Sequence, residues 1–199
     1  MRWDKSDGQA LMAVLWVAVV LVGGLLVAAP LARMAGIGVS EVRIPVELDR
    51  AAPAPAGLSG DGLAVEGVRD AVLVATDPTV VQRVLAEGPT LLAGGVWLAV
   101  MVLVMRMAAT LRDGDAFAPA NPRRLLAVAG LVLAEAVVVP LVRAVAADRL
   151  AAQVPEVHEG VAFGFGVSLM PVVAAFMVAA LSEAFRRGAK LREDTEGLV

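Results

Sequence analysis

Cysteine and tyrosine are absent from the 199-residue chain, and histidine occurs once. The lack of cysteine excludes disulfides, thiol nucleophiles and cysteine-ligated metals. With no Tyr and only three Trp, few residues remain for aromatic belts at a bilayer surface. The formal net charge of −3 gives no overall basic footprint for nucleic acid. We therefore expect no enzyme, no cofactor and no direct binding of nucleic acid.

Hydrophobic residues, in contrast, make up 59% of the chain, above the roughly 45–50% of soluble domains. A helix needs about 20 apolar residues to cross the hydrocarbon core of a bilayer. The predicted spans are residues 10–33, 89–109, 125–146 and 161–185. The first span is longer than the roughly 7–15 apolar residues of a signal peptide, which favours a retained helix over a cleaved one. The sequence thus predicts an all-α membrane protein built as a four-transmembrane-helix bundle.

Positive charges predict the orientation, because Lys and Arg near the ends of spans are concentrated in cytoplasmic segments. They cluster in residues 1–9, in the connector 110–124 and in the tail 186–199. Acidic residues predominate instead in segments 37–88 and 147–160. Four spans place these two sets on opposite sides of the membrane. We therefore expect both termini in the cytoplasm and segments 37–88 and 147–160 outside it.

The first outside segment, residues 37–88, is too long to be a turn alone. Val39–Leu48 alternates polar and apolar residues with the period of a half-exposed strand, and Gly67–Thr76 is predicted as a second strand. Thr79–Ala86 has the pattern of a short helix capped by Asp77. Because about 50 residues rarely build an independent core, we expect a small β-containing extracytoplasmic insertion that rests on the membrane helices.

The connector contains RDGDAFAPANPRR, residues 112–124, the densest polar and turn-forming stretch of the chain. Gly114 supplies a turn, Asp115 or Asn121 can cap a helix start, and the closing arginine pair lies at the level of lipid headgroups. One interpretation is a well-capped inside turn. The other is a docking surface for a cytoplasmic partner.

Two motifs are shared with a known family. The connector fits the pattern G-x-x-F-x-x-x-N-x-x-R-L at Gly114, Phe117, Asn121, Arg124 and Leu125. The end of the last span fits F-x-x-G-x-x-L followed by acidic residues, at Phe185, Gly188, Leu191, Glu193 and Asp194. In both motifs the chain resembles the bacterial membrane proteins called domain of unknown function 2975, which have four predicted spans and a large first outside loop. The resemblance implies the bacterial cytoplasmic membrane. It also implies a helix-turn-helix regulator as partner, since relatives are often encoded beside such proteins.

Polar residues inside the spans form a second candidate site. Glu135 lies near the middle of the third span, where a charged side chain costs roughly 2.5–3.5 kcal/mol on insertion, and Ser168 of the fourth span is its candidate partner. Glu135 either donates a hydrogen bond between helices or has a proton- or cation-coupled role. Pro140 and Pro171, which favour kinks inside spans three and four, would suit the second role. His158 is too isolated for us to predict a metal site.

Paired or nearby glycines provide small surfaces at which helices can approach closely. They are Gly23 with Gly24, Gly94 with Gly95, and Gly160 with Gly164. We expect these surfaces to pack the helices, and they are also candidates for the interface of a homo-oligomer.

We find no catalytic arrangement of residues in the sequence. Together with the two motifs predicted on the cytoplasmic side and the insertion predicted outside, this predicts a non-enzymatic protein. The leading hypothesis is a regulatory or sensory partner, held in the lipid bilayer, that presents its connector and tail to a cytoplasmic protein. The alternative is a small transporter or accessory transport subunit that uses Glu135.

Overall fold

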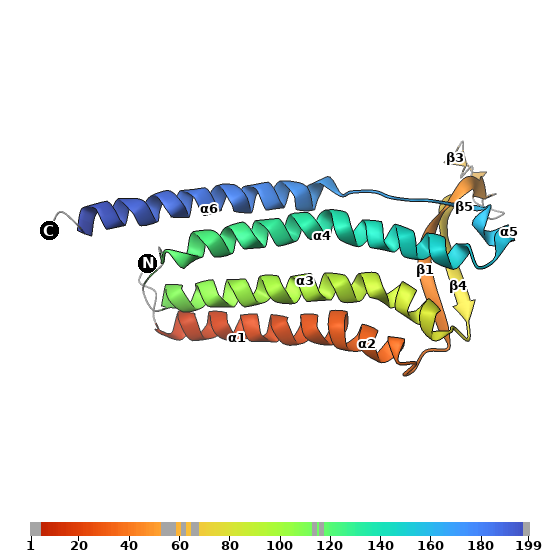
Figure 1. The fold of residues 1–199 in the computed structure, drawn as a ribbon, viewed down its shortest axis with the longest axis horizontal. Helices are drawn as coiled ribbons and strands as arrows, with labels where there is room; N and C mark the ends of the chain where they lie inside the picture. Colours follow the sequence, from red (N-terminus) through yellow and green to blue (C-terminus); the bar gives the residue numbers. More distant parts are fainter. Residues whose placement is uncertain are drawn as a thin grey trace. The chain divides into compact units, whose positions relative to one another are not determined.

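The computed structural model describes residues 5–52, 59–60, 63–64, 68–112, 115 and 118–196. Within them, four helices are long and apolar enough to cross a membrane, at Met12–Met34, Val80–Arg112, Ala120–Ala151 and Leu169–Leu191 (Figure 1). The chain divides into two compact units. The helical unit comprises Met1–Ala29, Thr90–Val139 and Val167–Val199, and the sheet unit comprises Pro30–Pro89 and Pro140–Gly166. The predicted set of four apolar helices is confirmed, whereas their assembly into one bundle stays a prediction.

The first helix runs through three segments without a break. These are α1 (Lys5–Val22), the π-helical segment η1 (Gly23–Ala28) and α2 (Ala29–Met34). A Schellman motif ends α2: the Gly36 N–H donates to the Arg33 carbonyl at 2.9 Å, and the Ile37 N–H donates to the Ala32 carbonyl at 2.9 Å. Gly36 has φ +85°, a left-handed conformation that favours glycine. The chain can therefore leave the helix sharply before the first strand.

Helices α3 (Val80–Arg112) and α4 (Ala120–Ala151) extend beyond the predicted spans at both ends. The predicted short helix Thr79–Ala86 is the beginning of α3 and not a separate element. Three boundaries between the units fall at prolines, Pro30, Pro89 and Pro140. Each of these prolines lacks the N–H that would donate a main-chain hydrogen bond within its helix.

The start of α3 is closed by a capping box rather than by Asp77 as predicted. The Thr79 N–H donates to Gln82 Oε1 at 2.9 Å, and the Gln82 N–H donates to Thr79 Oγ1 at 3.3 Å. Asp77 lies before this cap with φ +50°, and its N–H donates to the Ser40 carbonyl. Thr79 is therefore the N-cap, because its spacing to Gln82 satisfies two main-chain donors at once.

The last helix, α6 (Leu169–Glu196), begins eight residues later than the predicted span 161–185. Residues 161–162 form strand β5 instead of helix, because they find main-chain partners in the sheet. Pro171 is the third residue of α6, where the main-chain N–H would have no partner inside the helix. Pro171 therefore does not lie in the interior of a helix, and the prediction that it favours a kink within span four is wrong. The helix continues through most of the predicted tail.

The described part of the sheet unit contains the two predicted strands and three short ones. Strand β1 (Glu41–Ala52) pairs antiparallel with β4 (Val68–Thr76) and with β5 (Val161–Ala162), in the order β4-β1-β5. A two-stranded sheet, β2 (Ser59–Gly60) with β3 (Leu63–Ala64), lies between them in sequence. The alternation predicted for Val39–Leu48 is confirmed from Glu41 onward by the burial of Val42 and Ile44.

The core of the sheet unit joins one face of the sheet to helical residues of the same unit. Val42 and Ile44 pack with Leu150 of α4, and half-buried apolar side chains surround them. Those neighbours are Val39, Val46, Leu73, Leu85, Ala86 and Ala147. Because Leu85 and Ala86 belong to α3, the small sheet rests on two helices, as expected for a segment too short to build a core alone.

Candidate functional site

A buried polar cluster joins the end of α3 to the start of α4, on either side of the connector. Asn121 is only 2% exposed, and its Nδ2 donates to Thr110 Oγ1 at 2.9 Å. The Thr110 hydroxyl donates to the Met107 carbonyl at 2.8 Å. Arg124 Nη1 donates to Asn121 Oδ1 and to the Arg106 carbonyl, each at 3.0 Å. An unpaired buried polar group costs about 1–3 kcal/mol, so these bonds fix the two helix ends together.

Helix α6 joins the same region through one buried hydroxyl. Ser182 is 7% exposed, and its Oγ donates to the Pro122 carbonyl at 2.7 Å. Pro122 lies in the first turn of α4, where proline is well tolerated. Polar contacts therefore tie α6 to α4 and α4 to α3 at one end of the helical unit. We call this set the connector cluster: Thr110, Asn121, Arg124 and Ser182.

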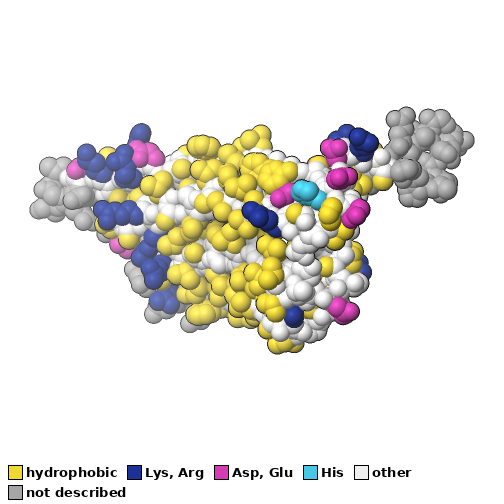
Figure 2. Space-filling view, turned by 45° about the vertical axis from the view of Figure 1, so that its right-hand side comes forward, with side chains coloured by type: hydrophobic (Ala, Val, Ile, Leu, Met, Phe, Trp, Pro, Cys, Tyr) yellow, Lys and Arg dark blue, Asp and Glu magenta, His cyan; other side chains and the backbone are white. Residues whose placement is uncertain are grey.

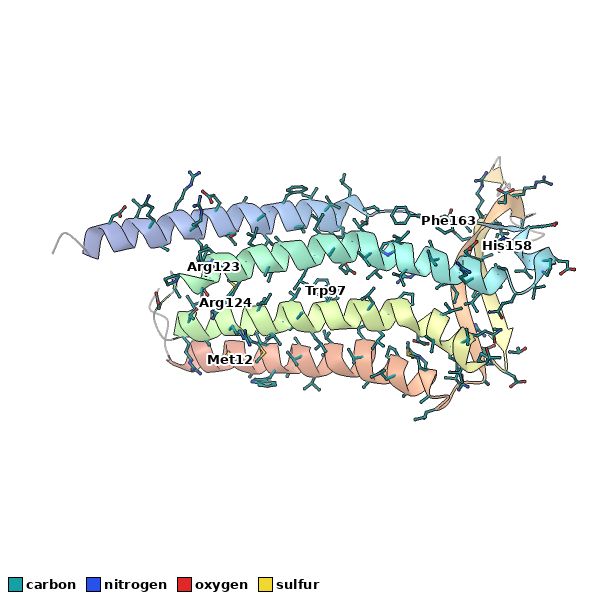
Figure 3. All side chains as sticks on the ribbon, in the orientation of Figure 1. Met12, Trp97, Arg123, Arg124, His158 and Phe163 are labelled. Carbon is teal, nitrogen blue, oxygen red and sulfur yellow. The ribbon has the colours of Figure 1, made fainter. Side chains whose placement is uncertain are left out.

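Cations surround the connector cluster on the outside. Arg123, Arg186, Arg187 and Lys190 are exposed, and Lys and Arg side chains gather at this end of the helical unit (Figure 2). Glu183 accepts hydrogen bonds from Arg186 Nε at 2.7 Å and from Arg187 Nε at 2.8 Å. Arg123 lies beside Arg124 at the start of α4 (Figure 3), and it has no acidic partner among the described residues.

The structure brings together two of the four residues predicted to dock a partner. Asn121 and Arg124 are hydrogen-bonded to each other, and Asn121 is buried whereas Arg124 is half-buried. Gly114 and Phe117 lie outside the described residues. Asn121 is the second residue of α4 and does not cap it, because its side chain bonds to Thr110 instead. Sequence reasoning missed Thr110 and Ser182; Thr110 lies close to the end of α3 that meets the connector, whereas Ser182 lies in the middle of α6 and gives no such signal.

The predicted tail motif lies on the continuous helix α6. Phe185 and Gly188 are half-buried, whereas Leu191 is 68% exposed. Because α6 continues to Glu196, the described part of the tail extends the helix beyond Ser182 and the connector cluster.

The predicted intramembrane pair is not joined. Glu135 is half-buried on α4, and Ser168 is exposed in the segment before α6. No hydrogen bond links them in the described part of the chain, and Glu135 has no other partner there. His158 Nδ1 lies 3.9 Å from Asp148 Oδ1, and the described residues contain no group of three metal-ligating side chains.

One predicted glycine pair does allow close packing of helices. A Cβ atom at Gly94 of α3 would lie 2.7 Å from the carbonyl carbon of Leu26 and would also meet its oxygen, whereas Gly95 has no such neighbour. Gly23 faces Leu98 of α3. Gly160 and Gly164 lie outside the helices, so the structure does not support their predicted role in helix packing.

A comparison with known protein families places the chain. The family model described as "Protein of unknown function (DUF2975)" matches residues 71–199. No curated protein and no solved structure matches the chain significantly. The matched region contains α3, α4 and α6 together with both motifs, and the four apolar helices suggest a multi-pass membrane protein. Since the match covers more than half of the chain, the protein belongs to the DUF2975 family.

Proposed function

We propose that the protein is a non-enzymatic regulatory or sensory membrane protein that binds a cytoplasmic protein at the connector end of its helical unit. The observation that supports this proposal is the combination of a fixed scaffold with exposed charge. Asn121, Arg124 and Ser182 are occupied in internal hydrogen bonds, while Arg123 and Arg187 remain exposed. A partner would therefore contact the outer cations, and the motif residues would hold those cations in place.

Charge complementarity defines the partner surface as acidic. Arg186 and Arg187 share one carboxylate, that of Glu183, so they are partly neutralised. Arg123 and Lys190 add charge without a described acidic neighbour. Complementary charges mainly steer association and select the partner. A helix-turn-helix regulator with an acidic face remains the candidate, and under this proposal both termini and the connector are cytoplasmic.

The test is co-purification of the full chain from bacterial membranes in mild detergent, with a charge reversal and a matched control. Arg123→Glu should reduce recovery of the partner at least tenfold, because a like charge at a contact costs several kcal/mol. Arg149→Glu changes an exposed arginine at the other end of α4 and should leave recovery unchanged. Equal recovery with both variants, or no partner under any growth condition, would overturn the proposal.

A transport function is the second candidate, and the half-buried Glu135 without a described partner favours it. An ionisable residue inside a membrane helix is a functional-site hypothesis by default. Reconstituted liposomes loaded with a pH-sensitive dye measure this directly. Proton flux that falls to the protein-free rate in Glu135→Gln would support transport, and equal flux with and without the protein would exclude proton coupling.

A further inference from the structure

A cavity of about 290 Å³ lies in the sheet unit, beside the inner face of β1 and β4. Most of its wall is apolar and comes from the strands β1 and β4, the end of α4, and the short helix α5 (Pro155–His158) with the residues just before it. These apolar residues include Val42, Ile44, Leu73, Leu150, Val154 and Val157. Val154 is 47% exposed, so the cavity reaches the surface where α4 ends. An apolar cavity with an opening can exchange its contents with solvent.

Two glutamine amides provide polar groups in the cavity wall. Gln82 Nε2 donates to Gln153 Oε1 at 2.6 Å, while Gln82 Oε1 accepts the Thr79 N–H of the capping box. The Gln82 amide is therefore held at both ends. Within the described residues the Gln153 amide nitrogen has no acceptor, so it can donate to a bound molecule. The start of α3 thus orients the polar part of the cavity.

The charge of the wall restricts what can bind. None of the described residues that line the cavity is charged. An ion transferred into an apolar site without a counter-charge loses hydration that nothing replaces. The cavity therefore favours neutral molecules, and the free amide donor favours one with an oxygen acceptor.

We propose that this cavity binds a small neutral amphiphile, with an apolar body in the cavity and one hydroxyl or carbonyl oxygen at Gln153. A cavity of about 150 Å³ holds benzene, and drug-sized ligands need roughly 300–1,000 Å³, so the size corresponds to roughly ten non-hydrogen atoms. The inference does not depend on the proposed cytoplasmic partner.

The absence of cysteine makes a site-specific test available. Ala75→Cys places one thiol in the cavity wall, since Ala75 lines it and pairs with Val42. Val72→Cys is the control, because Val72 lies on the same strand, does not line the cavity and is 56% exposed. The full-length protein is placed in lipid nanodiscs, and the rate at which N-ethylmaleimide alkylates the thiol is measured. This rate is compared without ligand, with 1-octanol as the neutral probe and with octanoate as its charged analogue.

The expected result is a saturable, at least fivefold slowing of alkylation of Ala75→Cys by 1-octanol, with Val72→Cys changed less than twofold. Octanoate at the same concentration and pH 8 should give no protection. Equal slowing at both positions would assign the effect to the bilayer, and either equal protection by octanoate or no saturation would overturn the proposal.

A second variant keeps the test valid if Ala75→Cys does not fold. Val157→Trp fills the cavity from α5, so 1-octanol should raise the melting temperature of the unmodified chain but not that of Val157→Trp. The same shift in both proteins would refute binding in the cavity. These measurements report ligand binding alone, so their failure is separate from failure to find a cytoplasmic partner.

Discussion

A methyl group at Gly94 would meet main-chain atoms of η1. The added Cβ would lie 2.7 Å from the Leu26 carbonyl carbon and 2.8 Å from the Leu26 Cβ. Carbon atoms pack at about 3.5–4.0 Å, so Gly94→Ala must move α3 from η1 by roughly 1 Å or distort one helix. Main-chain atoms of a helix cannot rotate away as the end of a side chain can.

The neighbouring residue separates this packing effect from helix propensity. Gly→Ala stabilises a helix by about 1 kcal/mol wherever it fits, and Gly95 has no atom within 4 Å of its added Cβ. Overpacking costs about 1–3 kcal/mol. The two variants share the propensity gain, so Gly94→Ala should have a free energy of unfolding lower than that of Gly95→Ala by about 1–3 kcal/mol.

Thermal unfolding of the two purified variants in one detergent measures the difference. Trp16 on α1 and Trp97 on α3 provide intrinsic fluorescence from the two helices. For a chain of this size, 1 kcal/mol corresponds to roughly 2–4 °C in Tm, so Gly94→Ala should melt roughly 2–12 °C below Gly95→Ala. A Gly94→Ala protein that melts with or above Gly95→Ala would show that η1 and α3 are not in this contact.

Three further substitutions test single contacts. Asn121→Ala should lower the free energy of unfolding by about 1–3 kcal/mol, because Thr110 and Arg124 lose a shared partner; thermal unfolding in detergent checks it, and an unchanged Tm would contradict it. Thr79→Ala should cost about 1 kcal/mol by removing the helix cap. Hydrogen exchange at the main-chain N–H of Gln82 should then become faster, and an unchanged rate would argue against the capping box. Gly36→Ala should cost about 1–2 kcal/mol for its positive φ, because the Arg83 guanidinium that the added Cβ would meet is the end of a flexible side chain and can move. Thermal unfolding in detergent checks it, and a Tm equal to that of the unmodified chain would contradict it.

The apolar spans could be predicted because a run of about 20 apolar residues has few alternatives. The start of α6 could not, since residues 161–167 are as apolar as a span but form β5 and an extended segment. Hydropathy responds to composition, whereas the pairing of Val161 with Leu48 depends on tertiary structure. The start of α3 could also have been predicted from local pattern, because the spacing of Thr79 and Gln82 is that of a capping box. This pair, and not Asp77, caps the helix.

The position of the candidate site along the chain could be predicted, whereas its role in docking a partner stays a prediction. The connector motif includes Asn121 and Arg124. Their polarity alone does not distinguish residues that contact a partner from residues that bond within the protein. Their partners, Thr110 and the Arg106 carbonyl, come from the preceding helix. Only the placement of α3 beside α4 distinguishes a residue that binds another protein from one that positions its neighbours.

Strand β5 has a consequence for the order in which the chain assembles during synthesis. β1 and β4 can pair once residue 76 has emerged, but Glu47 and Leu48 wait for Ala162 and Val161, which follow α3 and α4. Until then this part of β1 has an open edge, and open strand edges invite pairing with other chains. Ribosomal synthesis proceeds from the N-terminus at about 5–20 residues per second, so this edge stays exposed for several seconds. A chain truncated before Val161 would keep it permanently, and would be expected to aggregate through β1.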